Sequence, residues 1–260
     1  MRAFQKGNLR LSDLVLVPEL NGFSFNDLPE DRRNKFEDVT IRTVVLDTST
    51  DPSTRAEMFA RINKSGTVAN EAEIRRGSLP GLVTDLIREL AENDNFVAAT
   101  PMSQKAVDQR EREELVTRFF AYLEGWGASE GRFPNYQDRP KRYLYEYLKS
   151  ANDTASNNPA LLERMRAEFE GMLDRVQQLF PNGFRKNATA KTVPRVRFEA
   201  IATGTALALR QDVNLAVTSE QVVARMAERN FDEIVVSDGA NVRSRLEGRI
   251  DLVRSILLGQ

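Results

Sequence analysis

The amino-acid sequence predicts a mainly α-helical protein with a small β remnant, which places it in the α+β class. Beyond residue 50, apolar residues recur at the spacings of three and four that amphipathic helices produce. The segment VTIRTVVLD, at residues 39–47, is instead rich in β-branched residues and is the one convincing strand. Only the apolar run at residues 14–17 offers it a partner, and an unpaired strand exposes a row of backbone groups. We therefore expect that its other sheet partners are missing from this sequence.

The helical part begins with two segments that carry capping signals. Asp51 followed by Pro52 predicts a helix over residues 51–63, which Gly66 ends. Asn70 with Glu73 three residues later resembles a capping box and predicts the start of the next helix.

Further helices are predicted wherever apolar residues lie three or four apart. The polar tract NDTASNNP, at residues 152–159, interrupts this pattern and predicts a linker. The predicted helices cover residues 82–90, 115–123, 140–149, 161–180, 195–210, 219–229 and 241–258.

Composition excludes several classes of function. The length of 260 residues suits one large domain or two modest ones, and the 41% of hydrophobic residues are enough to bury a core. The 29% of charged residues are typical of a protein in water. The net charge of −1 provides no overall attraction to DNA or to a membrane. With no cysteine and no histidine, the chain cannot form disulfides, thiolate or histidine metal sites, or a Ser-His-Asp triad.

No apolar run approaches the roughly 18 to 20 residues that a membrane-spanning helix requires. The opening MRAFQKGNLRL lacks the hydrophobic centre of a signal peptide. We therefore expect a cytoplasmic protein without a membrane partner.

The first candidate site lies in FARINKSGTVANEAEIRRG, at residues 59–77. Arg61, Asn63 and the loop amides after Lys64 could form a small anion-binding cleft, since an arginine fork suits a phosphate group. The alternative is two capped helices whose basic residues form a solvated face, with Gly66 as the helix C-cap.

A second candidate is YQDRPKRYLYEY, at residues 136–147, where basic residues alternate with tyrosines. Arg139, Lys141 and Arg142 could hold phosphates while the tyrosines stack on bases. The alternative is that the tyrosines of this segment pack one helix face inward.

A third candidate is the basic tract at residues 184–200. It has five basic residues and one acidic residue, Glu199, so its net charge is +4 in a chain of net charge −1. A basic loop that leads into a helix N-terminus could bind phosphate or DNA. Equally, its arginines could pair with acidic neighbours in the fold. The candidate DNA-binding residues here are Arg185, Lys186, Arg195 and Arg197.

These segments together resemble a known family. FARINKSGTVANEAEIRRG is similar to the FxRIN-(x)2-G-(x)n-ExR segment of the ParB/sulfiredoxin-like domain at the N-terminus of GmrSD-type modification-dependent restriction enzymes. LRLSDLVLVPELNGFSFNDLPEDRRNKFED resembles the family's link between its nucleotide motif and the strand, and LVTRFFAYLEGW its next helix. FRK, PRVRFEAIATGTALAL and SRLEGRIDLV resemble its C-terminal helical part. The resemblance covers nearly all of the chain.

The resemblance implies an incomplete ParB-like core at residues 1–95 and a helical bundle at residues 96–260. It also implies a nucleotide-side cleft with a nucleoside triphosphate as its ligand. The residues that carry over to this cleft are Arg61, Asn63, Glu73 and Arg75.

The sequence departs from the family in two respects. It does not contain the upstream DGQQR signature, which implies nucleotide binding and hydrolysis, nor the histidine-containing nuclease domain of the restriction members. We expect the signature to precede MRAFQKGNLRL in a longer chain. We therefore identify no catalytic residue and no metal ligand, and expect no hydrolysis by this chain alone.

Two functions follow as expectations. The first is a DNA-related protein, of phage-defence or restriction type, that binds a nucleotide, DNA or both. The second is a non-catalytic helical protein-interaction module. Its partner would be a second copy or a protein that adds a strand beside residues 39–47.

Overall fold

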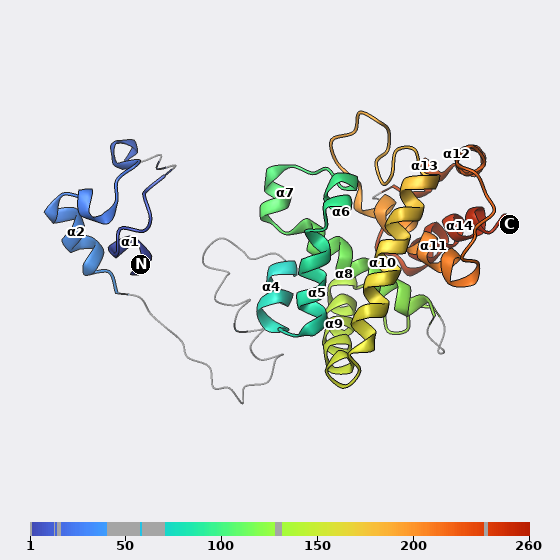
Figure 1. The fold of residues 1–260 in the computed structure, drawn as a ribbon, viewed down its shortest axis with the longest axis horizontal. Helices are drawn as coiled ribbons and strands as arrows, with labels where there is room; N and C mark the ends of the chain where they lie inside the picture. Colours follow the sequence, from blue (N-terminus) through green and yellow to red (C-terminus); the bar gives the residue numbers. More distant parts are fainter. Residues whose placement is uncertain are drawn as a thin grey trace. The chain divides into compact units, whose positions relative to one another are not determined.

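The computed structural model describes residues 2–12, 14, 17–40, 58, 71–127, 132–236 and 239–260 (Figure 1). These residues form thirteen α-helices and two short 3-10 helices, with no β-strand among them. The predicted predominance of α-helix is therefore confirmed. The strand predicted at residues 39–47 and the helix predicted at residues 51–63 fall almost wholly outside the described residues.

The chain divides into two compact units, Met1–Ser49 and Thr50–Gln260. This division differs from the predicted boundary between residues 95 and 96. The reason is packing: helix α5 (Leu82–Ala91) lies against α8 (Glu111–Trp126) and α9 (Pro140–Asn157), and its buried residues belong to the same core as theirs.

The N-terminal unit has a small aromatic core. Phe4, Phe25 and Phe36 pack with ring centroids 5.3–5.7 Å apart. Ser24 caps the second 3-10 helix reciprocally with Asp27, and the hydrogen bonds from Ser24 lower the pKa of the Asp27 carboxyl group. The elements of this unit are α1 (Arg2–Gln5), η1 (Pro18–Leu20), η2 (Phe25–Asp27) and α2 (Glu30–Glu37).

The second unit is a bundle of helices around one continuous core. In Figure 1 it is the part coloured from cyan to red. Besides α5, α8 and α9, its helices are α4 (Glu71–Ser78), α6 (Asp94–Ala99), α7 (Gln104–Asp108), α10 (Ala160–Leu179), α11 (Arg195–Gln211), α12 (Ser219–Glu228), α13 (Phe231–Ile234) and α14 (Arg243–Leu257).

The linker predicted at residues 152–159 is wrong, because α9 continues as a helix to Asn157. Asn152 explains the error. It is 8% exposed, and its Oδ1 accepts hydrogen bonds from the backbone N–H groups of Val83 (2.9 Å) and Thr84 (3.3 Å). A side chain of one helix thus caps the N-terminus of another, which satisfies donors that α5 leaves free. Gly81 permits the approach, since a Cβ atom there would lie 2.5 Å from the Asn152 side chain.

Helix α11 is the centre of the bundle. It packs against α8, α10 and α14, and thirteen of its seventeen residues are buried. A helix that is buried on nearly every side needs small residues where its neighbours approach most closely. At Gly204 a Cβ atom would lie 2.7 Å from the Val253 Cβ atom and 2.9 Å from the Ile250 carbonyl oxygen of α14.

We therefore expect Gly204→Ala to destabilise the protein by about 1–3 kcal/mol, because the added methyl group meets backbone and a branched side chain. Gly171→Ala is the matched control inside α10, where a Cβ atom meets nothing within 4 Å. It should stabilise by about 0.5–1 kcal/mol through helix propensity. Urea unfolding measures both changes, and a gain of stability in both variants would contradict the close contact of α11 with α14.

Five buried charged residues, which we term the buried charge network, join four helices. Glu199 of α11 accepts hydrogen bonds from Arg118 Nη1 of α8 (2.6 Å) and from Arg249 Nη2 of α14 (2.5 Å). Arg118 Nε also donates to Glu114 Oε1 (2.8 Å), and Arg75 of α4 pairs with the other oxygen of Glu114. Each of the five is less than 9% exposed, so each charge depends on its partners for the stabilisation that water would otherwise give.

Glu199→Ala should destabilise the protein by about 3–5 kcal/mol, because it leaves Arg118 and Arg249 buried without their shared carboxylate. Glu111→Ala is the control, since Glu111 pairs with Arg195 near the surface, where ion pairs contribute about 0–1 kcal/mol. Urea unfolding midpoints compare the two, and equal small losses would show that the network contributes little.

The network also predicts a pH dependence. Burial alone would raise the pKa of Glu114, but the guanidinium groups of Arg75 and Arg118 outweigh it and hold the pKa below its ordinary 4.5. A lowered folded-state pKa adds stability that is complete above the unfolded pKa and is lost as the pH falls through the folded one. The free energy of unfolding should therefore decrease below pH 4.5. In Glu114→Gln this decrease should be smaller, and an unchanged acid limb would contradict the assignment.

Candidate functional site

The residues predicted for the nucleotide-side cleft fall into two groups. Arg61 and Asn63 lie outside the described residues, so their role stays a prediction. Glu73 and Arg75 lie on α4. Arg75 is 3% exposed and forms the buried pair with Glu114, so its charge is directed into the core.

The basic residues of the second candidate are exposed, whereas its tyrosines pack inward. Arg139 precedes the first turn of α9, which contains Lys141 and Arg142. Tyr136 is buried, and its ring lies 5.3 Å from that of half-buried Tyr143. Burial raises the pKa of the Tyr143 hydroxyl to about 12. The alternative of inward packing therefore describes these rings, and only the basic side chains remain for contact with a ligand.

The four basic residues of the third candidate have different environments. Arg185 donates to the carbonyl oxygens of Asn182 (3.4 Å) and Ala188 (3.2 Å), which holds its own loop. Arg195 binds Glu111 through two hydrogen bonds of 2.9 and 2.7 Å. Lys186 and Arg197, in contrast, line one pocket.

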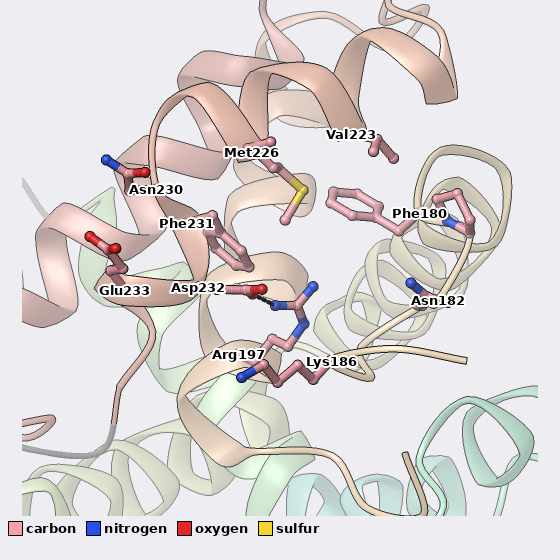
Figure 2. A pocket seen from close by; sticks show the side chains of 13 residues that line it. Phe180, Asn182, Lys186, Arg197, Val223, Met226, Asn230, Phe231, Asp232 and Glu233 are labelled. Atoms are coloured by element: carbon pink, nitrogen blue, oxygen red, sulfur yellow. Dashed lines mark hydrogen bonds and ion pairs between the residues drawn. The ribbon is translucent and has the colours of Figure 1, made fainter. Parts of the chain in front are cut away.

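This pocket, which we term the α11–α13 pocket, has a volume of about 370 Å³. It lies where the end of α10 and the following loop meet the first turn of α11, α12 and α13 (Figure 2). Apolar, polar and charged side chains line it. The lining residues are Phe180, Pro181, Asn182, Gly183, Lys186, Arg197, Val223, Met226, Ala227, Asn230, Phe231, Asp232 and Glu233.

Local sequence builds the corner that forms one wall of the pocket. Thr218 caps α12 reciprocally with Gln221, which fixes where that helix begins. Asn230 adopts a left-handed conformation with φ 51°, which asparagine tolerates better than most residues, and it turns the chain from α12 into α13. Buried Phe231 anchors the turn, so Asp232 is brought to face α11.

Arg197 is the most constrained polar group in the pocket. Its side chain is 10% exposed, and its Nη1 lies 2.5 Å from Asp232 Oδ1. Its guanidinium carbon lies 4.9 Å from the centre of the Phe231 ring, within the range of a cation–π contact. Figure 2 shows the guanidinium group among Asp232, Met226 and Asn182. The Arg197 Nε atom is buried and has no hydrogen-bond partner in the described part of the chain.

The charges of the lining residues balance, since Lys186 and Arg197 face Asp232 and Glu233. The members of the ion pair differ in burial, however, because the Asp232 side chain is 56% exposed. The buried guanidinium group of Arg197 would need another anion if it lost this partner, whereas water would hydrate the exposed Asp232 carboxylate. An anionic ligand group could take its place beside Arg197, with its apolar portion against Met226 and Phe180.

Sequence reasoning identified Lys186 and Arg197 but missed the wall that α12 and α13 contribute. Asp232 follows Arg197 by 35 residues, and no spacing rule connects them. It also missed the buried charge network, although Glu199 was noted as the lone acid of the basic tract.

The described residues contain no cluster of three or more acidic side chains that could hold a metal ion. None of their helices is long and apolar enough to cross a membrane.

Comparison of this chain with models of protein families, with curated proteins and with solved structures finds no match.

Proposed function

We propose that this chain is a nucleotide-binding protein with a DNA-related role, of the phage-defence or restriction type that its resemblance to the ParB/sulfiredoxin-like family implies. The observation that carries the proposal is the presence of Lys186 and Arg197 in one pocket with the apolar side chains of Phe180, Met226 and Phe231. A nucleotide presents this combination of chemistry, since it joins charged phosphates to a flat and weakly polar base.

The pocket suits a single nucleotide in size. Ligand pockets commonly span about 300–1,000 Å³, and the α11–α13 pocket lies near the lower end. Lys186 supplies a mobile point charge and Arg197 a planar fork, both of which bind phosphate oxygens. The amides of Asn182 and Asn230 can hydrogen-bond a base or a sugar hydroxyl.

The proposal includes binding without hydrolysis by this chain alone. The chain lacks the DGQQR signature of the family it resembles. Binding also requires a phosphate to compete with Asp232 for Arg197. We therefore expect moderate affinity that decreases as salt is added.

Contact with DNA would use basic side chains that are exposed to solvent. Arg139, Lys141 and Arg142 are exposed at the start of α9, and Lys186 is exposed at the pocket rim. Phosphate contacts of this kind give affinity without sequence preference.

A second candidate function is a helical protein-interaction module. Several large apolar side chains between residues 213 and 242 are exposed: Val213 (69%), Val223 (48%), Ile234 (42%), Val236 (44%) and Val242 (41%). Of these, Val223 also lines the α11–α13 pocket, so a partner protein that bound there would meet an exposed apolar side chain.

The test is binding of fluorescent mant-ATP to the full chain at low salt. Lys186→Ala should weaken binding about tenfold, because it removes a phosphate contact without disturbing a buried residue. Lys191→Ala is the matched control, since Lys191 is exposed in the same loop but does not line the pocket. Arg197→Lys should also weaken binding, because lysine keeps the charge but loses the fork.

If both variants lost mant-ATP affinity equally, the effect would be one of overall charge, and the pocket would not be the binding site. Absence of mant-ATP binding would refute the nucleotide proposal. Self-association that Val223→Ser abolishes would instead support the interaction module.

A further inference from the structure

The N-terminal unit contains a second pocket, independent of the α11–α13 pocket. This N-terminal pocket has a volume of about 410 Å³. Six apolar side chains and two arginines line it: Phe4, Leu9, Leu11, Leu20, Leu28, Phe36, Arg10 and Arg32. The pocket thus combines an apolar interior with charge of one sign.

The core of this unit is incompletely buried. Its most buried apolar residues, Phe4, Phe25 and Leu28, remain 7–8% exposed, whereas many core residues of the second unit are fully buried. Leu9 lines the pocket and is 54% exposed. A unit of this size lies near the lower limit at which a hydrophobic core alone gives stability. Additional apolar surface placed over the pocket would therefore stabilise the unit.

The charges at the pocket indicate what chemistry would cover it. Both ionisable side chains of the lining are arginines, and both are exposed. Arg10 is oriented by its hydrogen bond to the Gly22 carbonyl oxygen (2.6 Å) and by an exposed ion pair with Asp27 (3.4 Å). Arg32 lies on α2. A ligand that carries carboxylates beside apolar side chains would complement both the arginines and the apolar lining of the pocket.

We propose that the N-terminal pocket docks an acidic, amphipathic segment of a partner protein. Leucine or phenylalanine side chains of that segment would fill the pocket beside Leu9, and its carboxylates would pair with Arg10 and Arg32. A surface of anionic lipid fits less well. Residues 1–40 contain six basic and seven acidic residues, so their net charge is −1 and they have no net attraction to such a surface.

The test uses the full chain and a fluorescein-labelled synthetic peptide in which leucines on one helical face alternate with aspartate and glutamate. Fluorescence anisotropy should show binding that Leu9→Ser and Arg32→Glu each weaken about tenfold. Both positions are exposed, so the variants should keep their folds, which circular dichroism checks.

The matched control is Arg33→Glu, which changes the charge of the same helix equally at a residue that does not line the pocket. It should leave peptide binding within about twofold of the unmodified chain. A second control is the peptide with lysine in place of each acidic residue, which should not bind.

Three results would overturn the proposal. The first is failure of the acidic peptide to bind, or equal binding of the lysine peptide. The second is an equal effect of Arg32→Glu and Arg33→Glu. The third is another occupant: vesicles of phosphatidylserine and phosphatidylcholine that bind where the peptide does not, or a dimer that Leu9→Ser dissociates.

Discussion

The arrangement of the bundle depends on the carboxylate of Glu199. It lies on the central helix α11 and receives one guanidinium group from α8 and another from α14. Removing such charges from water costs several kcal/mol each unless every one of them is paired. Arg118 extends the same constraint to Glu114, and Glu114 extends it to Arg75 on α4. The pairs therefore favour the register of these helices in which every one of these charges has a partner.

The α11–α13 pocket follows from that register. Within five residues, α11 directs side chains to four environments. Arg195 pairs with Glu111 near the surface, and Arg197 lines the pocket. Phe198 lies in the core, and Glu199 belongs to the buried charge network. The ion pairs of Glu199 therefore fix the rotation of α11 about its axis, and this rotation sets the direction in which Arg197 points. Gly204 sets the depth at which α11 rests on α14, so the position of Arg197 depends on two residues that do not touch a ligand.

Much of the helical organisation could be predicted from sequence because apolar spacing reports burial directly. The stripes at residues 82–90 and 161–180 correspond to α5 and α10, and the segment at 241–258 to α14. The exception at residues 152–159 has a physical cause. Asparagine favours loops because its side chain competes for backbone hydrogen bonds, but Asn152 directs that capacity to the distant amides of α5. Local propensity contains no information about a partner 69 residues away.

Partners that are distant in the sequence also explain why the basic residues of the candidate sites differ in their environments. From sequence, Arg75, Arg195 and Arg197 were alike, since each belongs to a locally basic run. Their acidic partners lie 39, 84 and 35 residues away, and these partners decide what each arginine can do. Arg75 is committed to the core and Arg195 to a bidentate surface pair. Of the three arginines, only Arg197 is buried with a partner that is mostly exposed to solvent, since the Asp232 side chain is 56% exposed. That asymmetry, rather than the density of positive charge, distinguishes Arg197 from the other two arginines.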